Sequence, residues 1–157
     1  MRVLAIDPGA KTGVCLYDAD RQKVELSLII PDGLTGFQNW VEGYALQPFA
    51  QYWDVLVVES FELEEGSHGI DAESPLEIIG YLKSLGIPIV WQRRMQRGKN
   101  TVTSVAVLKR AGLYPKRGEL KEGHQVAALQ HALAYLIKRR HLGTIRLLHP
   151  PEEEIAA

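Results

Sequence analysis

The fold is decided by the first fourteen residues, MRVLAIDPGAKTGV (1–14). An apolar run over residues 3–6 ends at Asp7, and a proline and Gly9 follow it directly. A second β-prone run then covers residues 14–17. A strand, a tight glycine-rich turn and another strand are typical of a hairpin. The sequence therefore predicts a β-hairpin with a carboxylate at the end of its first strand.

That carboxylate, Asp7, loses solvation after a buried strand unless a cation or a hydrogen-bond donor meets it. One interpretation is a metal or phosphate site, and the other is a turn aspartate that bonds its own backbone. A second acid favours the interpretation as a metal or phosphate site. Residues 54–58 form a short β-branched run without alternation, which suits a strand buried on both faces, and the run ends in Glu59. In α/β sheets, functional sites lie at the carboxyl ends of the strands, where acids such as these come together.

The other elements follow from apolar periodicity and from glycine and proline positions. They are strands over 23–30 and 87–91, helices over 35–46, 75–85, 100–111 and 122–140, and a short element over 146–148. Pro75 is expected in the first turn of its helix, with Ser74 as N-cap. Pro88 favours either an edge position for its strand or an early bulge. The whole chain, residues 1–157, is expected to form one α/β domain.

The predicted helix over 122–140 has two distinct faces. Its apolar face carries Val126, Leu129, Leu133, Leu136 and Ile137. His124, Ala127 and His131 fall on the opposite side, within about one-sixth of the circumference. We expect His124 to be a site residue. His131 is either a site residue or a side chain that orients a neighbour.

Charge is unevenly distributed, although the formal net charge is only −1. The segment 51–82 has eight acids and no lysine or arginine, whereas 91–121 has nine basic residues against one acid. Such a basic block favours contact with a polyanion, and two solvated surfaces are the alternative. The expected DNA contacts are Arg93, Arg94, Arg97, Lys99, Lys116 and Arg117. Phe61 either stacks on bases or belongs to the core.

Several classes of protein are disfavoured by composition. Cys15 is the single cysteine, so neither an intrachain disulfide nor a cysteine-based zinc site is expected. The proline and glycine after Asp7 interrupt the first apolar run, which argues against a signal peptide. No apolar stretch approaches the roughly 18 residues of a membrane span. We expect a cytoplasmic protein without a membrane partner.

Taken in order, these motifs resemble the ribonuclease H-like fold and, within it, the RuvC-type Holliday junction resolvases, especially their short phage and actinobacterial relatives. The resemblance extends from residue 2 to about 137. It rests on AIDPG at 5–9 with TG at 12–13, VVE at 57–59, GK at 98–99 and HQVAALQHAL at 124–133. It implies a five-stranded mixed sheet with three antiparallel N-terminal strands, flanked by helices. It also implies a homodimer that acts on branched DNA.

The same resemblance implies structure-selective cleavage of DNA by two Mg²⁺ or Mn²⁺ ions about 4 Å apart. By analogy Asp7 bridges the ions, Glu59 binds one, and His124 lies near the second. Lys99 would stabilise charge at the scissile phosphate. The family pattern His-x-x-Asp-Ala-x-x-His-Ala has an aspartate where this chain has Ala127. We therefore expect impaired cleavage.

Two explanations of Ala127 stay open. It is either an introduced Asp→Ala change in a nuclease or the natural residue of a catalytically inactive, branched-DNA-binding homologue. A third hypothesis is a sugar-kinase or actin-like ATPase, whose phosphate loop also follows an Asp-x-Gly turn. That class needs a duplicated domain and a second such turn, and this chain has neither.

Overall fold

The computed structural model describes residues 1–45, 52–61, 70–93, 102–114 and 123–151. Its centre is one five-stranded sheet with the strand order β3-β2-β1-β4-β5. The strands are β1 (Arg2–Asp7), β2 (Thr12–Asp18), β3 (Lys23–Ile30), β4 (Val55–Ser60) and β5 (Val90–Arg93). β1, β2 and β3 are antiparallel neighbours, whereas β4 is parallel to β1 and β5 is parallel to β4. The predicted mixed sheet, with three antiparallel N-terminal strands, is confirmed.

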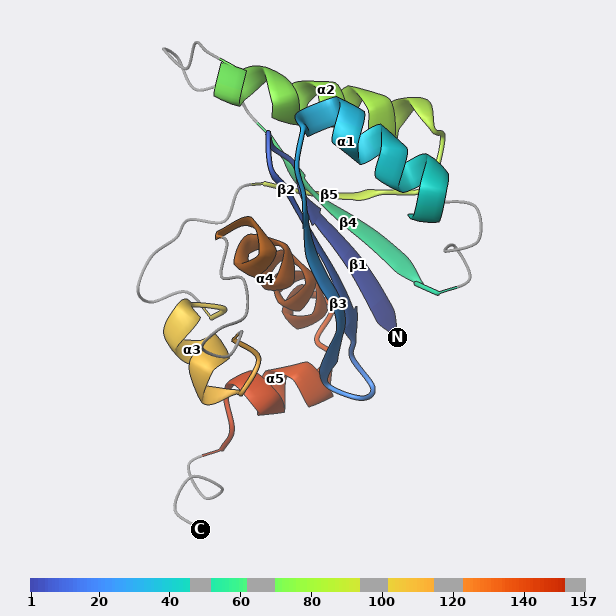
Figure 1. Ribbon diagram of the computed structural model, residues 1–157. Helices are drawn as coiled ribbons and strands as arrows, with labels where there is room; N and C mark the ends of the chain where they lie inside the picture. The colour runs from blue at the N-terminus through green and yellow to red at the C-terminus, as the bar shows by residue number, and fades with distance from the viewer. Residues whose placement is uncertain (46–51, 62–69, 94–101, 115–122, 152–157) are drawn as a thin grey trace.

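Helices cover both faces of this sheet (Figure 1). They are α1 (Gly33–Trp40), followed by the π-helical turn η1 (Val41–Ala45), α2 (Ile70–Ser84), α3 (Val105–Arg110), α4 (Gly123–Lys138) and α5 (Leu142–Leu148). α1 and α2 lie on one face. α4 lies on the other, with α3 and α5 beside it (Figure 1). Among the described residues no helix is long and apolar enough to cross a membrane.

The alternation of side chains along β1 and β4 places the two strand-end acids on one face of the sheet. Val3 and Ala5 of β1 belong to the core under α4, whereas Leu4 and Ile6 belong to the core under α1 and α2. Because side chains alternate along a strand, Asp7 continues the face of Val3 and Ala5. In β4, Val57 lies in the core under α4, so Glu59 is directed to that face too. Both acids therefore lie on the α4 side.

The predicted start of α2 is wrong. The helix begins at Ile70, so Pro75 lies inside it and Ser74 is not its N-cap. A proline here removes one backbone hydrogen bond to the carbonyl four residues earlier. The position is close to the helix start, and Pro75 is buried, which offsets the lost bond by apolar contact.

Other boundaries also differ from the prediction, and α5 begins at Leu142 instead of residue 146. α3 begins at Val105 because the Ser104 side chain caps it, accepting a hydrogen bond from the Val107 amide at 3.4 Å. The fifth strand occupies Val90–Arg93 instead of 87–91 and leaves out Pro88, which has no amide hydrogen for a ladder. The strand lies at the edge of the sheet, which is one of the two alternatives predicted from Pro88.

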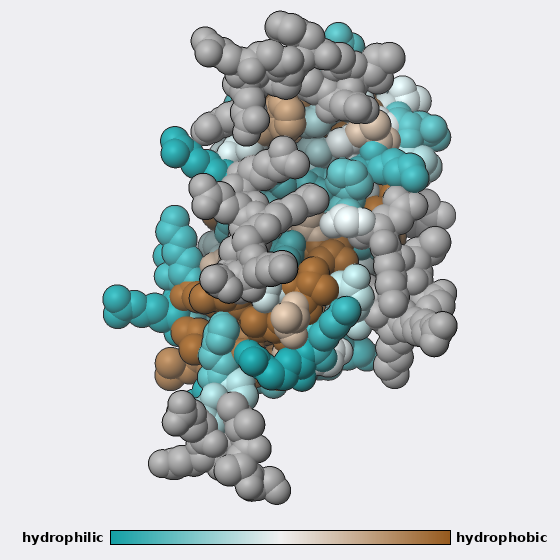
Figure 2. Space-filling model, turned by 90° about the vertical axis from the view of Figure 1, so that its left-hand side faces the viewer, coloured by the Kyte–Doolittle hydropathy of each residue, from teal (hydrophilic) through white to brown (hydrophobic). Residues whose placement is uncertain are grey.

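The surface on the α3 side is mixed in polarity. Figure 2 shows apolar areas between hydrophilic side chains on this side of the molecule. Val102 and Val105 are the exposed large apolar residues of the α3 segment, while Leu108 of the same helix is fully buried. α3 therefore packs with one side only.

Candidate metal centre

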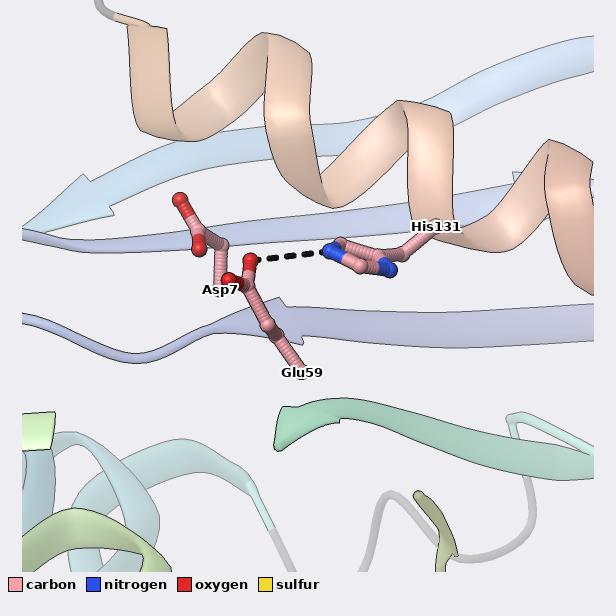
Figure 3. A group of neighbouring side chains, drawn as sticks. All are labelled: Asp7, Glu59 and His131. Atoms are coloured by element: carbon pink, nitrogen blue, oxygen red, sulfur yellow. Dashed lines mark hydrogen bonds and ion pairs between the residues drawn. The ribbon is translucent and has the colours of Figure 1, made fainter. Parts of the chain in front are cut away.

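Three side chains that can bind a metal converge at the carboxyl ends of β1 and β4. They are Asp7 from β1, Glu59 from β4 and His131 from α4 (Figure 3). One ligand atom from each lies within 4.8 Å of the other two. All three residues are buried, with relative exposures of 5%, 7% and 2%. The structure brings together the two acids that the sequence predicts as site residues.

His131 is held through both nitrogens of its ring. Its Nε2 atom lies 2.9 Å from Oε2 of Glu59, and its Nδ1 atom lies 2.9 Å from Oε1 of Gln92. Two lone pairs cannot face each other at this distance, so a proton lies between Nε2 and the Glu59 carboxylate. A metal ion bound by both groups would take the place of that proton.

His124 approaches the same group from the first turn of α4. Its Nδ1 atom lies 2.7 Å from Oδ2 of Asp7, and its side chain is 42% exposed. The ring therefore holds Asp7 on the solvent side, whereas His131 holds Glu59 in the interior. His124 was predicted as a metal ligand. It contacts Asp7, while the ligand atoms within 4.8 Å of one another belong to Asp7, Glu59 and His131.

The electrostatics of Asp7 favour a cation. Its pKa is raised to about 6, first because burial disfavours the charged carboxylate and also because Glu59 lies beside it. The hydrogen bond with His124 opposes this rise. A divalent cation among these groups would neutralise the carboxylates and remove most of the burial cost.

Ala127 lies on the side of α4 that carries both histidines, since positions 124, 127 and 131 follow helical spacing. It is 5% exposed. Along the helix axis, position 127 lies between His124, which contacts Asp7, and His131, which contacts Glu59. A methyl group there contributes no ligand.

The predicted DNA contacts are only partly covered by the described residues. Phe61 directly follows β4 and is partly buried, and Arg93 is the exposed last residue of β5. The other predicted contacts lie outside the described residues, and their roles stay predictions. These are Arg94, Arg97, Lys99, Lys116 and Arg117.

Two residues of the centre go beyond the sequence prediction. His131 was left open between a site role and an orienting role, and its signal was the spacing of seven residues from His124. Gln92 carried no signal in the sequence. Its place beside His131 depends on the pairing of Glu59 with Gln92 between β4 and β5.

The sheet order and its helices define a ribonuclease H-like fold. A T. thermophilus RuvC solved in complex with a Holliday junction substrate matches with a TM-score of 0.63 at 16% identity, over 88% of this chain and 96% of that chain. A second Thermus thermophilus RuvC structure matches with a TM-score of 0.58 at 16% identity, over 89% and 97%. No protein-family model and no curated protein matches the sequence. The predicted fold class is confirmed, and identity this low establishes the fold alone.

Proposed function

We propose that this protein is a structure-selective DNA endonuclease of the RuvC type that binds four-way junctions as a homodimer. The buried group of Asp7, Glu59 and His131 carries this proposal, because it lies at the carboxyl ends of two sheet strands. The shared fold supports the same reading, since one matching RuvC was solved with a Holliday junction substrate.

The donor set fits a divalent cation. Two carboxylates and one imidazole offer the oxygen and nitrogen ligands that Mg²⁺ or Mn²⁺ accepts. Asp7, Glu59 and His131 would hold one ion, and Asp7 with His124 would lie beside a second. When bound, such ions supply a hydroxide nucleophile and stabilise the leaving oxygen. The contacts of His131 with Glu59 and of His124 with Asp7 orient the carboxylates beforehand.

Ala127 limits the activity of the chain as it stands. A second ion would have only Asp7 and His124 among the described residues, because position 127 offers a methyl group. We therefore propose impaired cleavage with retained DNA binding. A natural binding-only homologue is the second candidate function, because it too would carry a residue without a ligand atom at position 127.

DNA contact is assigned to the side chains around the carboxyl ends of β4 and β5. Arg93 would contact phosphates, and Phe61 would meet bases of an opened junction. The same role is proposed for Arg94, Arg97, Lys99, Lys116 and Arg117, with Lys99 also near the scissile phosphate. The proposed relatives are the short phage and actinobacterial resolvases, acting on DNA in the cytoplasm.

The test is a cleavage assay on a synthetic four-way DNA junction with Mg²⁺ or Mn²⁺. It compares the parent chain with Ala127→Asp and with Ala127→Asn, which has the same shape as aspartate without the charge. A gel shift in Ca²⁺ measures binding separately. The nuclease proposal expects all three chains to bind and only Ala127→Asp to cut paired strands efficiently. Binding without cleavage by any chain would favour the binding-only homologue, and loss of binding throughout would refute a role in DNA processing.

A further inference from the structure

Gln92 contacts the ring nitrogen of His131 that points away from the metal group. Its Oε1 atom lies 2.9 Å from Nδ1 of His131, while the other ring nitrogen faces Glu59. The His131 side chain is only 2% exposed, so bulk water does not reach the ring as a replacement partner. The orientation of this imidazole therefore depends on the two side chains that contact it.

The sheet register holds Gln92 in this place. Glu59 and Gln92 are direct partners in the parallel pair of β4 and β5, so their side chains leave the same face. The Ser60 hydroxyl donates to the Gln92 carbonyl at 2.9 Å, which adds a hydrogen bond between the two strands. His131 enters between the two side chains from α4. β4, β5 and α4 thus hold Glu59, His131 and Gln92 in one row of contacting side chains.

We infer that Gln92 is a positioning residue that keeps a hydrogen on Nδ1 of His131, so that Nε2 can present its lone pair to a bound metal ion. An amide oxygen only accepts hydrogen bonds, so its partner Nδ1 must donate. A metal-ligating histidine is oriented in this way by an acceptor at its other nitrogen, and loss of that acceptor lowers metal affinity about 10- to 100-fold. The inference rests on the proposed metal-dependent function and names a residue outside its ligands.

Two substitutions separate the acceptor from the bulk of the side chain. Gln92→Met keeps the approximate length and removes the acceptor. Gln92→Glu keeps the acceptor and removes the amide donor. Gln130→Met is the matched control, because Gln130 precedes His131 in α4 and its amide donates to the Thr103 carbonyl at 2.8 Å instead of the metal group.

The experiment measures Mn²⁺ affinity by the loss of the free-ion electron paramagnetic resonance signal. It is combined with long-range ¹H–¹⁵N spectra of the His131 ring, recorded without metal and with Mg²⁺. We expect Gln92→Met to weaken Mn²⁺ binding about 10- to 100-fold and to change the His131 nitrogen shifts. Gln92→Glu should retain both properties, and Gln130→Met should leave both unchanged.

Parental Mn²⁺ affinity and unchanged ring shifts in Gln92→Met would overturn the inference. So would loss of affinity in Gln92→Glu, because the amide donor and not the acceptor would then be required. If the parent chain binds no Mn²⁺, the proposed metal-dependent function fails. The metal-free spectra still decide the role of Gln92, because ring shifts insensitive to Gln92→Met would refute it.

Discussion

A Cβ atom added to Gly13 would lie 2.0 Å from the carbonyl oxygen of His124, so these two backbones are in direct contact. Gly13 pairs with Asp7 in the hairpin register. The missing side chain lets the first turn of α4 come close to β2, beside the strand-end acid. The contact between His124 and Asp7 depends on this approach.

Gly13→Ala should therefore disturb both the stability and the metal centre. Overpacking of this kind costs about 1–3 kcal/mol, and more where backbone must move. We expect a lower free energy of unfolding in urea together with weaker Mn²⁺ binding. Gly80→Ala is the control, because its added Cβ meets nothing within 4 Å and lies inside α2, where alanine is favoured by roughly 0.5–1 kcal/mol. Equal effects of the two substitutions would contradict a close contact at Gly13.

Asp7→Asn should stabilise the metal-free protein at neutral pH. The pKa of Asp7 is raised from 3.8 to about 6. Between these two pH values the native state still holds a proton that the unfolded state has already released. The parent chain therefore loses stability as pH rises through about 6. The shift corresponds to roughly 3 kcal/mol. Urea unfolding in chelator, at pH 4 and pH 7.5, should show the advantage of Asp7→Asn growing by up to that amount.

With Mn²⁺ at neutral pH the parent chain should be more stable than Asp7→Asn, because the asparagine removes a charged ligand. An advantage of Asp7→Asn that is constant with pH would show that the carboxyl group titrates normally. Persistence of that advantage in saturating Mn²⁺ would remove Asp7 from the metal centre.

Mn²⁺ should bind more tightly than Mg²⁺, because an imidazole nitrogen in the donor set suits transition-metal ions better than hard Mg²⁺. At a free ion concentration of 100 times Kd, binding adds about 2.7 kcal/mol of stability. That gain raises Tm by about 5–10 °C in a domain of this size. His131→Gln should reduce the difference between the two ions, whereas His149→Gln, at an exposed histidine bonded to the Val102 carbonyl, should preserve it. Equal Tm increases with both ions in the parent chain would argue against a nitrogen ligand.

Arg93→Ala should weaken junction binding without changing which DNA structures are preferred. A phosphate contact contributes through counterion release, so its removal lowers the slope of log K against log salt by about 1. Gel shifts in Ca²⁺ over a salt series measure this slope. Lys23→Ala is the control, since Lys23 is also exposed but begins β3 at the opposite end of the sheet from Asp7. A similar slope change in both variants would indicate a diffuse charge effect instead of a contact at Arg93.

The sheet was largely predictable because its signals are local. The apolar run before Asp7, the glycine-rich turn after it and the uninterrupted run before Glu59 each reflect short-range backbone and burial preferences. The predicted start of α2 was wrong because a tertiary contact compensates for a local cost. Pro75 shows this, since burial offsets its missing hydrogen bond inside α2.

The sequence by itself determined that two acids end two buried strands and that one late helix carries His124 and His131 on a single side. The tertiary structure alone decided which histidine meets which acid, because that depends on how closely α4 approaches β2 at Gly13. It also decided that Gln92 contacts His131 on the side away from Glu59. Strand register between distant segments is set by the whole sheet and its packing, and no local pattern in the sequence encodes it.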